Sequence, residues 1–209
     1  MTDNHIELIG AVVVSVITTI IGPIIYEYIK RKFFPANKEN DIIREDLEKN
    51  LVIDQELSSI SDELNSDRIW ITQFHNGGHF LLSNKSIQKF SITYEITKPG
   101  VSSATQIFKE IPISLYSRAM NELLNSGFIF ISDFEDPKIA TFGLKTGAEA
   151  TGTVATYVVA LYDIATNRCI GSLGIDYSEK TELTHEQTDL LFEKSNRIAG
   201  YLSVFLKGH

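Results

Sequence analysis

Two apolar stretches decide the fold: Val154-Ala155-Thr156-Tyr157-Val158-Val159-Ala160-Leu161-Tyr162 and Cys169-Ile170-Gly171-Ser172-Leu173-Gly174-Ile175-Asp176-Tyr177. A polar turn over residues 163–168 separates them, and β-rich runs on either side of a short Asn-containing turn predict a hairpin. The first run is apolar at both alternating sets of positions. Both faces of its strand are therefore expected to be covered.

The pattern changes to that of a helix after Lys180. Thr184 and Gln187 have the T-x-x-Q spacing of a capping box, in which each side chain accepts a hydrogen bond from the other residue's amide. One apolar stripe follows at helical spacing. Its members are Leu191, Ile198, Leu202 and Phe205.

Composition excludes several classes of protein. The chain has 209 residues, is 43% hydrophobic and carries a formal net charge of −8. That charge argues against a nucleic-acid partner, because phosphate backbones are bound by clustered Lys and Arg. The single cysteine, Cys169, excludes an intrachain disulfide and a cysteine-based zinc cluster.

The N-terminal part contains an uncharged segment from Leu8 to Tyr26. As a helix, about 19 residues span about 28 Å, close to the thickness of a bilayer core. We expect a tail at 1–7, a single transmembrane helix at 8–29 and a basic juxtamembrane linker at 30–40. Lys30-Arg31-Lys32 would keep everything that follows on the cytoplasmic side, which makes this a single-pass membrane protein with a cytoplasmic C-terminal domain. The alternative is a hydrophobic segment packed against a partner chain in an oligomer.

An amphipathic linker helix is predicted over residues 41–65. Its second apolar set, Ile53, Leu57, Ile60 and Leu64, has 4-3-4 spacing, and the first set, Ile43, Leu47 and Leu51, is offset from it. The helix could dock on its own domain or pair with a second chain as a short coiled coil. We expect both, at different ends of the helix.

The middle of the chain predicts further strands around an inserted helix. Residues 68–75 read as a strand ended by an Asn76-Gly77-Gly78 turn, and residues 89–96 alternate between polar and apolar. Pro112 is predicted to start a helix with Leu115, Ala119 and Leu123 on one stripe, capped by Gly127. Residues 128–132 are predicted to form another strand, and 137–152 a short helix with a mobile cover loop.

From Asp41 to Lys207 the chain resembles a GAF domain. The resemblance is carried by the 154–162 and 169–177 strands with their Ile-Gly-Ser-Leu-Gly motif, by the helix after Thr184 and by the His75-Asn76-Gly77 sequence that ends the first strand. It implies an α+β fold over 66–209. In that fold an antiparallel sheet carries the terminal helices on one face and the inserted helix and cover loop on the other.

The resemblance implies a ligand-binding or dimerising regulatory module, but no particular cofactor. The Asn-Lys-Phe-Asp-Glu signature of cyclic-nucleotide-binding GAF domains is absent. The GAF-like methionine sulfoxide reductases use several cysteines. A bilin thioether needs a cysteine at the pocket rim, whereas Cys169 alternates with Leu173 and Ile175 and is read as a core residue.

No catalytic or metal-binding constellation is predicted. His75 and His79 could share a metal, but a turn whose imidazoles bond to its backbone is the favoured interpretation. Asp133, Glu135 and Asp136 could act as acid and base, although Asp136 before Pro137 is more simply a turn residue. We therefore do not expect an enzyme. Activity lost on replacing Asp133 or Cys169 would contradict this.

The ligand-binding candidates are residues expected on the inserted side of the sheet. They are Tyr94, Phe130, Ser132, Asp133, Phe142, Thr146, Thr151, Thr153, Tyr157 and Asp176. The alternative is that these residues fill a core without a vacancy. The function predicted is a membrane-anchored sensor that binds an unidentified small molecule and acts through a homodimer of its terminal helices or through a partner protein. A ligand-free dimerisation scaffold at the membrane is the alternative.

Overall fold

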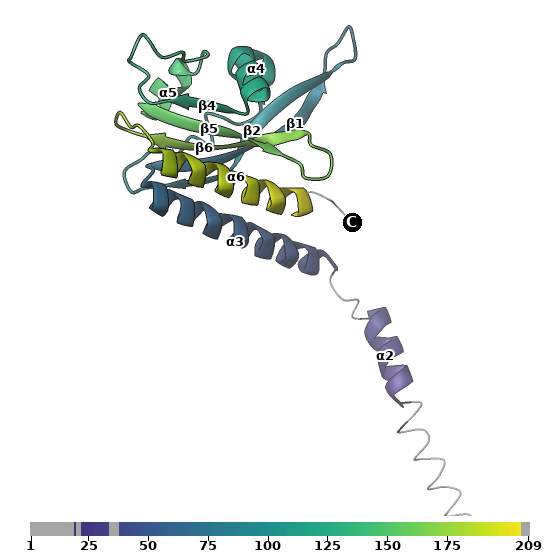
Figure 1. Cartoon of the computed structure of the whole chain (residues 1–209). Coiled ribbons are helices and arrows are strands. Elements are labelled where there is room, and N and C mark those ends of the chain that lie inside the picture. Colours follow the sequence, from purple (N-terminus) through teal and green to yellow (C-terminus); the bar gives the residue numbers. More distant parts are fainter. Residues whose placement is uncertain (1–18, 20–21, 34–37, 206–209) are drawn as a thin grey trace, which may run out of the picture. The chain divides into compact units, whose positions relative to one another are not determined.

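The structure is a computed structural model that describes residues 19, 22–33 and 38–205 (Figure 1). The chain divides into two units, Met1–Glu48 and Lys49–His209. In the first unit, helix α2 spans Gly22–Phe33, with Tyr26 and Tyr28 exposed. Helix α3, Lys38–Leu64, begins in the first unit and continues into the second.

The predicted transmembrane segment lies almost entirely outside the described residues. Of Leu8–Tyr26, only residue 19 and the start of α2 are described. Within the described ranges, no helix has both the length and the apolar character needed to cross a bilayer. The anchor stays a prediction.

The second unit is built on one antiparallel sheet with strand order β3-β2-β1-β6-β5-β4. The strands are β1 Arg68–His79, β2 Ser86–Thr97, β3 Ile111–Pro112, β4 Phe128–Ile131, β5 Ala155–Tyr162 and β6 Cys169–Tyr177. The hairpin predicted from the two apolar stretches is confirmed, because β5 and β6 pair from Ala155↔Tyr177 to Tyr162↔Cys169.

Helices α3 and α6 (His185–Phe205) cover one face of the sheet (Figure 1). The predicted 4-3-4 set of α3, Ile53 to Leu64, is buried in the same core as Leu191, Ile198 and Leu202 of α6. The capping box of α6 is also confirmed. The Gln187 amide donates to Thr184 Oγ1 at 3.2 Å, and the Thr184 amide donates to Gln187 Oε1 at 3.0 Å.

The inserted segment covers the opposite face with η2 (Ile113–Tyr116), α4 (Ser117–Ser126) and α5 (Lys145–Thr151). Ala119 and Leu123 are buried as predicted, and Gly127 caps α4 at φ 85°. The prediction for Leu115 was wrong: it is 71% exposed, because a 3₁₀ turn precedes α4 and breaks the stripe.

Strand β1 does not stop at Asn76 as the sequence predicted. It continues to His79 and pairs with β2 past a register shift between Asn76 and His79. Gly78, at φ 94°, supplies the left-handed residue within this irregularity. The turn lies later, where the Phe80 amide donates to the Lys85 carbonyl at 2.9 Å.

A β-bulge at Thr93 in β2 places the apolar residues before it and after it on opposite faces of the sheet. Ile71 is opposite Tyr94, but Thr72 is opposite Ile92, which leaves Thr93 as the extra residue. Phe90 and Ile92 therefore face the inserted segment, whereas Tyr94 and Ile96 pack on the core under the terminal helices. One extra residue in a strand moves each side chain that follows it to the opposite face of the sheet.

Candidate functional site

A cavity of about 90 Å³ lies between the sheet and the inserted segment, and most of its wall is apolar. Strands β1, β2, β4, β5 and β6 supply its floor, and residues of 108–123 and 134–151 supply its cover. The lining residues are Trp70, Thr72, Phe90, Ile92, Phe108, Tyr116, Ala119, Met120, Leu123, Ile129, Phe134, Leu144, Gly147, Ala148, Thr151, Thr153, Thr156, Val158, Ser172 and Asp176.

Three aromatic rings form one side of the cavity. Phe90 lies edge-on to Tyr116 with ring centroids 5.7 Å apart, and Phe108 lies 6.1 Å from Tyr116. Gly147 of α5 meets this group closely, since a Cβ there would stand 2.9 Å from Phe108 Cζ. A glycine at this position lets α5 approach the rings.

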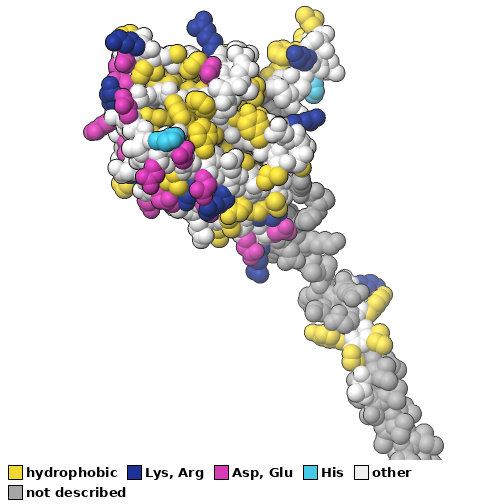
Figure 2. Space-filling model, viewed as in Figure 1, with side chains coloured by type: hydrophobic (Ala, Val, Ile, Leu, Met, Phe, Trp, Pro, Cys, Tyr) yellow, Lys and Arg dark blue, Asp and Glu magenta, His cyan; other side chains and the backbone are white. Residues whose placement is uncertain are grey.

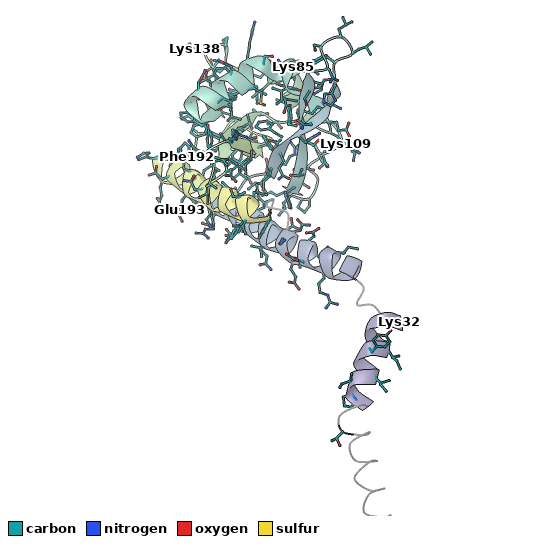
Figure 3. The ribbon with its side chains drawn as sticks, turned by 90° about the vertical axis from the view of Figure 1, so that its right-hand side faces the viewer. Lys32, Lys85, Lys109, Lys138, Phe192 and Glu193 are labelled. Carbon is teal, nitrogen blue, oxygen red and sulfur yellow. The ribbon has the colours of Figure 1, made fainter. Side chains whose placement is uncertain are left out.

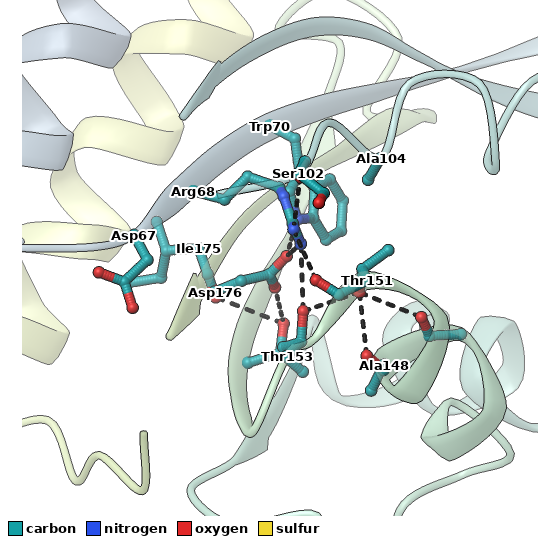
Figure 4. Close-up of polar contacts among 12 residues, drawn as sticks. Asp67, Arg68, Trp70, Ser102, Ala104, Ala148, Thr151, Thr153, Ile175 and Asp176 are labelled. Atoms are coloured by element: carbon teal, nitrogen blue, oxygen red, sulfur yellow. Dashed lines mark hydrogen bonds and ion pairs between the residues drawn. The ribbon is translucent and has the colours of Figure 1, made fainter. Parts of the chain in front are cut away.

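A buried arginine closes the polar end of the site (Figure 4). Arg68 is 1% exposed, and its Nη1 donates to Asp176 Oδ2 at 2.8 Å and to Thr153 Oγ1 at 3.1 Å. Its Nη2 donates to the carbonyls of Ser102 at 2.8 Å and Thr151 at 2.9 Å. One guanidinium thus joins β1, β6, the loop after β2 and the end of α5.

Asp176 accepts hydrogen bonds from neutral donors as well. Trp70 Nε1 donates to its Oδ2 at 3.0 Å, and Thr156 Oγ1 donates to its Oδ1 at 2.6 Å. Burial raises the pKa of Asp176, while Thr156, Arg68 and Trp70 oppose that rise by stabilising the carboxylate. The Asp176 carboxylate and both Nη atoms of Arg68 are therefore hydrogen-bonded within the protein, whereas the buried Arg68 Nε makes no hydrogen bond among the described residues.

Glu95 flanks the arginine and holds the loop after β2. It accepts hydrogen bonds from Ser103 Oγ, from the Ala104 amide at 2.7 Å and from Thr105 Oγ1 at 2.7 Å, and Arg68 Nε lies 3.5 Å from its Oε1. Burial alone would raise the pKa of Glu95. These donors outweigh burial, and the net pKa is lowered.

Three of the predicted site residues, Thr151, Thr153 and Asp176, line the cavity. Tyr94, Phe130 and Tyr157 were expected on this side, and that expectation was wrong. They pack on the core under the terminal helices. The bulge at Thr93 turns Tyr94 away, and its hydroxyl donates to Asn50 Oδ1 of α3 at 2.6 Å.

The alternation of side chains along β4 and β5 explains why Phe130 and Tyr157 do not face the cavity. Ile129 and Ile131 take the inserted side of β4, and Val158 and Ala160 take that side of β5. Phe130 and Tyr157 therefore occupy the opposite face, with ring centroids 5.2 Å apart.

The remaining candidates lie around the cover and do not line the cavity. Phe142 packs on the core of the inserted side, and Thr146 is exposed on α5. The Ser132 carbonyl accepts from the Thr181 amide at 3.2 Å. Asp133 Oδ1 accepts from the Glu135 amide at 2.8 Å, a local turn bond.

The predicted turn role of Asp136 is confirmed, because its Oδ1 accepts from the Lys138 amide at 2.9 Å. His75 Nε2 lies 2.9 Å from Ser91 Oγ across the β1–β2 pair. Cys169 is partly buried at the edge of the inserted-side core, and burial raises the pKa of its thiol.

Most of the lining residues were not among the candidates chosen from the sequence, and four polar or aromatic residues of β1 and β6 stand out among the residues missed: Arg68, Trp70, Thr72 and Ser172. Strand alternation carried a signal for them, because residues 68, 70 and 72 must share the face opposite Ile69 and Ile71. Thr72 and Ser172 meet there with hydroxyl oxygens 2.6 Å apart.

No protein-family model and no curated protein matches the sequence. Solved structures do match. The phycocyanobilin-bound GAF domain from a cyanobacterial phytochrome aligns with a TM-score of 0.58 at 16% identity, over 81% of this chain and 93% of that one. A far-red cyanobacteriochrome photoreceptor aligns with a TM-score of 0.58 at 12% identity, over 81% and 97% of the two chains.

The blue-light-absorbing PixJ GAF domain of Thermosynechococcus elongatus aligns with a TM-score of 0.56 at 13% identity, over 76% of this chain and 86% of that one. Identities this low establish the fold alone. The fold expected from the resemblance is confirmed: this chain has the fold of a GAF domain, with a mixture of helices and an antiparallel sheet.

Proposed function

We propose that this chain is a GAF-type regulatory module that binds a small, mostly apolar molecule between the sheet and helices α4 and α5. The observation that carries the proposal is the cavity of about 90 Å³ with an aromatic wall and one polar end. Concave, apolar sites with a few placed polar groups are the usual form of small-molecule sites.

The size of the cavity limits the ligand. Pockets for drug-sized molecules have volumes of about 300 Å³ or more, and a cavity of about 150 Å³ accommodates benzene. At about 90 Å³, this cavity suits a molecule no larger than a single small ring unless α5 moves outward. A bilin of the kind bound by the structural neighbours is a linear tetrapyrrole and far exceeds this volume. Cys169 is not among the lining residues.

Recognition would depend mainly on shape. The Asp176 carboxylate that lines the cavity is already bonded to Arg68 Nη1, and the Thr72 and Ser172 hydroxyls form their own pair. A ligand with an unshielded charge would lose its hydration without gaining a free partner, which costs several kcal/mol. We therefore expect a neutral ligand with at most one or two hydrogen-bonding atoms.

The first test is chemical. The purified full chain is denatured and the released molecules are analysed by mass spectrometry, and a panel of small neutral metabolites is then screened by thermal shift. A true ligand raises the unfolding midpoint progressively with its concentration over its dissociation constant.

Helix α5 offers a matched control. Ala148 lines the cavity and is 7% exposed, whereas Ala150 on the same helix is exposed. Ala148→Leu should fill the cavity and abolish the shift, and Ala150→Leu should preserve it. Binding that survives Ala148→Leu would place the ligand elsewhere.

The membrane and output parts of the proposal rest on the sequence. The uncharged Leu8–Tyr26 segment would anchor the module with its C-terminal domain in the cytoplasm, and occupancy of the cavity would act through a homodimer or a partner protein. Carbonate extraction of cell membranes tests the anchor. Release of the chain into the supernatant would remove it from the proposal.

A ligand-free scaffold is the second candidate, and one observation favours it. Helix α3 exposes Ile43, Leu47 and Leu51 by 53%, 57% and 57% in an apolar set with a spacing of four. Leu47→Glu should dissociate a dimer formed through this stripe, as measured by sedimentation equilibrium. Leu115→Glu, at an exposed leucine on η2, is the control. A chain that is monomeric throughout rules the scaffold out, and a dimer that resists Leu47→Glu places its interface away from this stripe.

A further inference from the structure

The β1–β2 hairpin ends in a group of exposed large apolar side chains. Leu81 and Leu82 are each 100% exposed and Phe80 is 51% exposed. Scattered single exposed leucines are common on protein surfaces, but consecutive fully exposed leucines beside a phenylalanine are not. Figure 1 shows the hairpin projecting past the sheet, and Figure 2 shows apolar side chains at its end.

The end of the hairpin has a defined turn. The Phe80 amide donates to the Lys85 carbonyl at 2.9 Å, and the Asn84 amide donates to the Phe80 carbonyl at 2.9 Å. Asn84 takes the left-handed conformation at φ 52°, which asparagine tolerates well. Leu81 and Leu82 therefore stand at the outermost positions of an ordered turn.

The charge of the hairpin is opposite to that of the whole chain. Residues 68–94 contain no Asp or Glu, although the chain carries a net charge of −8. The outer part of the hairpin carries His79, Lys85 and Lys89, and Lys89 pairs with Glu110 of the next loop at 3.2 Å. Figure 3 shows Lys85 near the end of the hairpin and Lys109 on the same side of the domain.

We propose that residues Phe80–Leu82 insert into the headgroup region of an anionic phospholipid bilayer, with Lys85 and His79 contacting the lipid phosphates. A convex tip of three residues is too small for a stable protein interface, which buries about 800 Å² on each partner. The headgroup region of a lipid bilayer is fluid and can surround a small apolar tip, and anionic headgroups attract nearby cations. This proposal does not depend on the cavity ligand and goes beyond it.

Site-specific fluorescence on the full chain tests the insertion. Leu81→Trp is reconstituted into vesicles of phosphatidylcholine with or without phosphatidylserine, and brominated lipids act as quenchers. Leu115→Trp, at a leucine 71% exposed on η2, is the matched control. Both variants retain Trp70, so the unmodified chain supplies the background. Unchanged circular dichroism establishes that each variant is folded.

Insertion predicts strong quenching at position 81 in vesicles containing phosphatidylserine and little at position 115. Adding Lys85→Gln to Leu81→Trp should lower the ratio of inserted to free tip about fivefold, the effect of one cation near an anionic surface. Quenching at 81 no greater than at 115 would overturn the proposal. A blue shift at 81 that depends on protein concentration and not on lipid would overturn it in favour of self-association.

Discussion

Replacing Arg68 by methionine should destabilise the domain strongly. The methionine keeps the apolar part of the side chain but removes the cation from a site where the arginine is 1% exposed. Asp176 then loses its 2.8 Å ion pair, and the carbonyls of Ser102 and Thr151 lose their donors.

The expected loss in the free energy of unfolding is about 3 kcal/mol. Removing one partner of a buried ion pair typically costs about 3–5 kcal/mol. The lower end applies because Asp176 keeps the hydrogen bonds from Thr156 at 2.6 Å and Trp70 at 3.0 Å. A domain stable by about 5–15 kcal/mol should remain folded.

The loss should also depend on pH. Without Arg68, the folded-state pKa of Asp176, which burial already raises, moves further above the unfolded value of about 3.9. A carboxyl whose pKa is raised on folding penalises the folded state above that raised pKa. The penalty disappears as the pH falls toward the unfolded value. The difference between Arg68→Met and the original chain should therefore narrow between neutral pH and about pH 4.

Urea denaturation followed by circular dichroism measures both effects. Arg197→Met on α6 is the control, since that arginine pairs with Glu56 and Glu193 at the surface and its loss should barely move the midpoint. A loss for Arg68→Met below about 1 kcal/mol, or one that is the same at acid and neutral pH, would refute this account of the buried network.

Three further predictions test other parts of the fold. Leu57→Ala should lower the free energy of unfolding by about 2–5 kcal/mol, because Leu57 is 0% exposed. Leu51→Ala on the same helix, at a residue 57% exposed, should have little effect. Equal losses in urea denaturation would contradict the assignment of Leu57 to the buried face of α3. Thr184→Ala should cost about 1 kcal/mol by removing the capping box of α6, and Thr184→Ser should restore most of it; a neutral Thr184→Ala would mean that the cap contributes nothing. Cys169 should react slowly with iodoacetamide in the folded chain and rapidly in urea. Burial raises the pKa of its thiol, which leaves little reactive thiolate near pH 8. Equal reaction rates in the folded and unfolded chain would contradict the burial of Cys169.

Local chemistry in the sequence was enough to predict the parts of the fold that depend on neighbouring residues. The β5–β6 hairpin, the capping box at Thr184 and the buried set of α3 are repeating patterns within short windows. Each of these features is encoded by a repeat of apolar residues or by a pair of capping residues, so it can be recognised without knowledge of distant contacts.

The site was harder to predict because it depends on single-residue irregularities and long-range contacts. Nothing in the alternation of residues 89–96 marks Thr93 as a bulge, and the bulge moves Tyr94 to the other face. The Arg68 partners Ser102 and Thr151 lie 34 and 83 residues away and accept through backbone carbonyls, so their residue types carry no signal. The size of the cavity depends on how Ala148 and Gly147 of α5 meet the aromatic wall.

The polar end of the cavity lies one strand position from contacts with the terminal helices. Asp176 faces the cavity, and the next residue, Tyr177, faces the other side of the sheet, where its hydroxyl donates to the Leu64 carbonyl at the end of α3 at 2.9 Å. On β1, Arg68 follows Asp67, whose Oδ2 accepts from the Ser178 amide at 2.7 Å. A ligand that displaced α5 would strain the bond from Arg68 to the Thr151 carbonyl at 2.9 Å. Arg68 is paired with Asp176, and Tyr177, the next residue of β6, bonds to the end of α3. Coupling between the cavity and the terminal helices therefore has to cross only the thickness of the sheet.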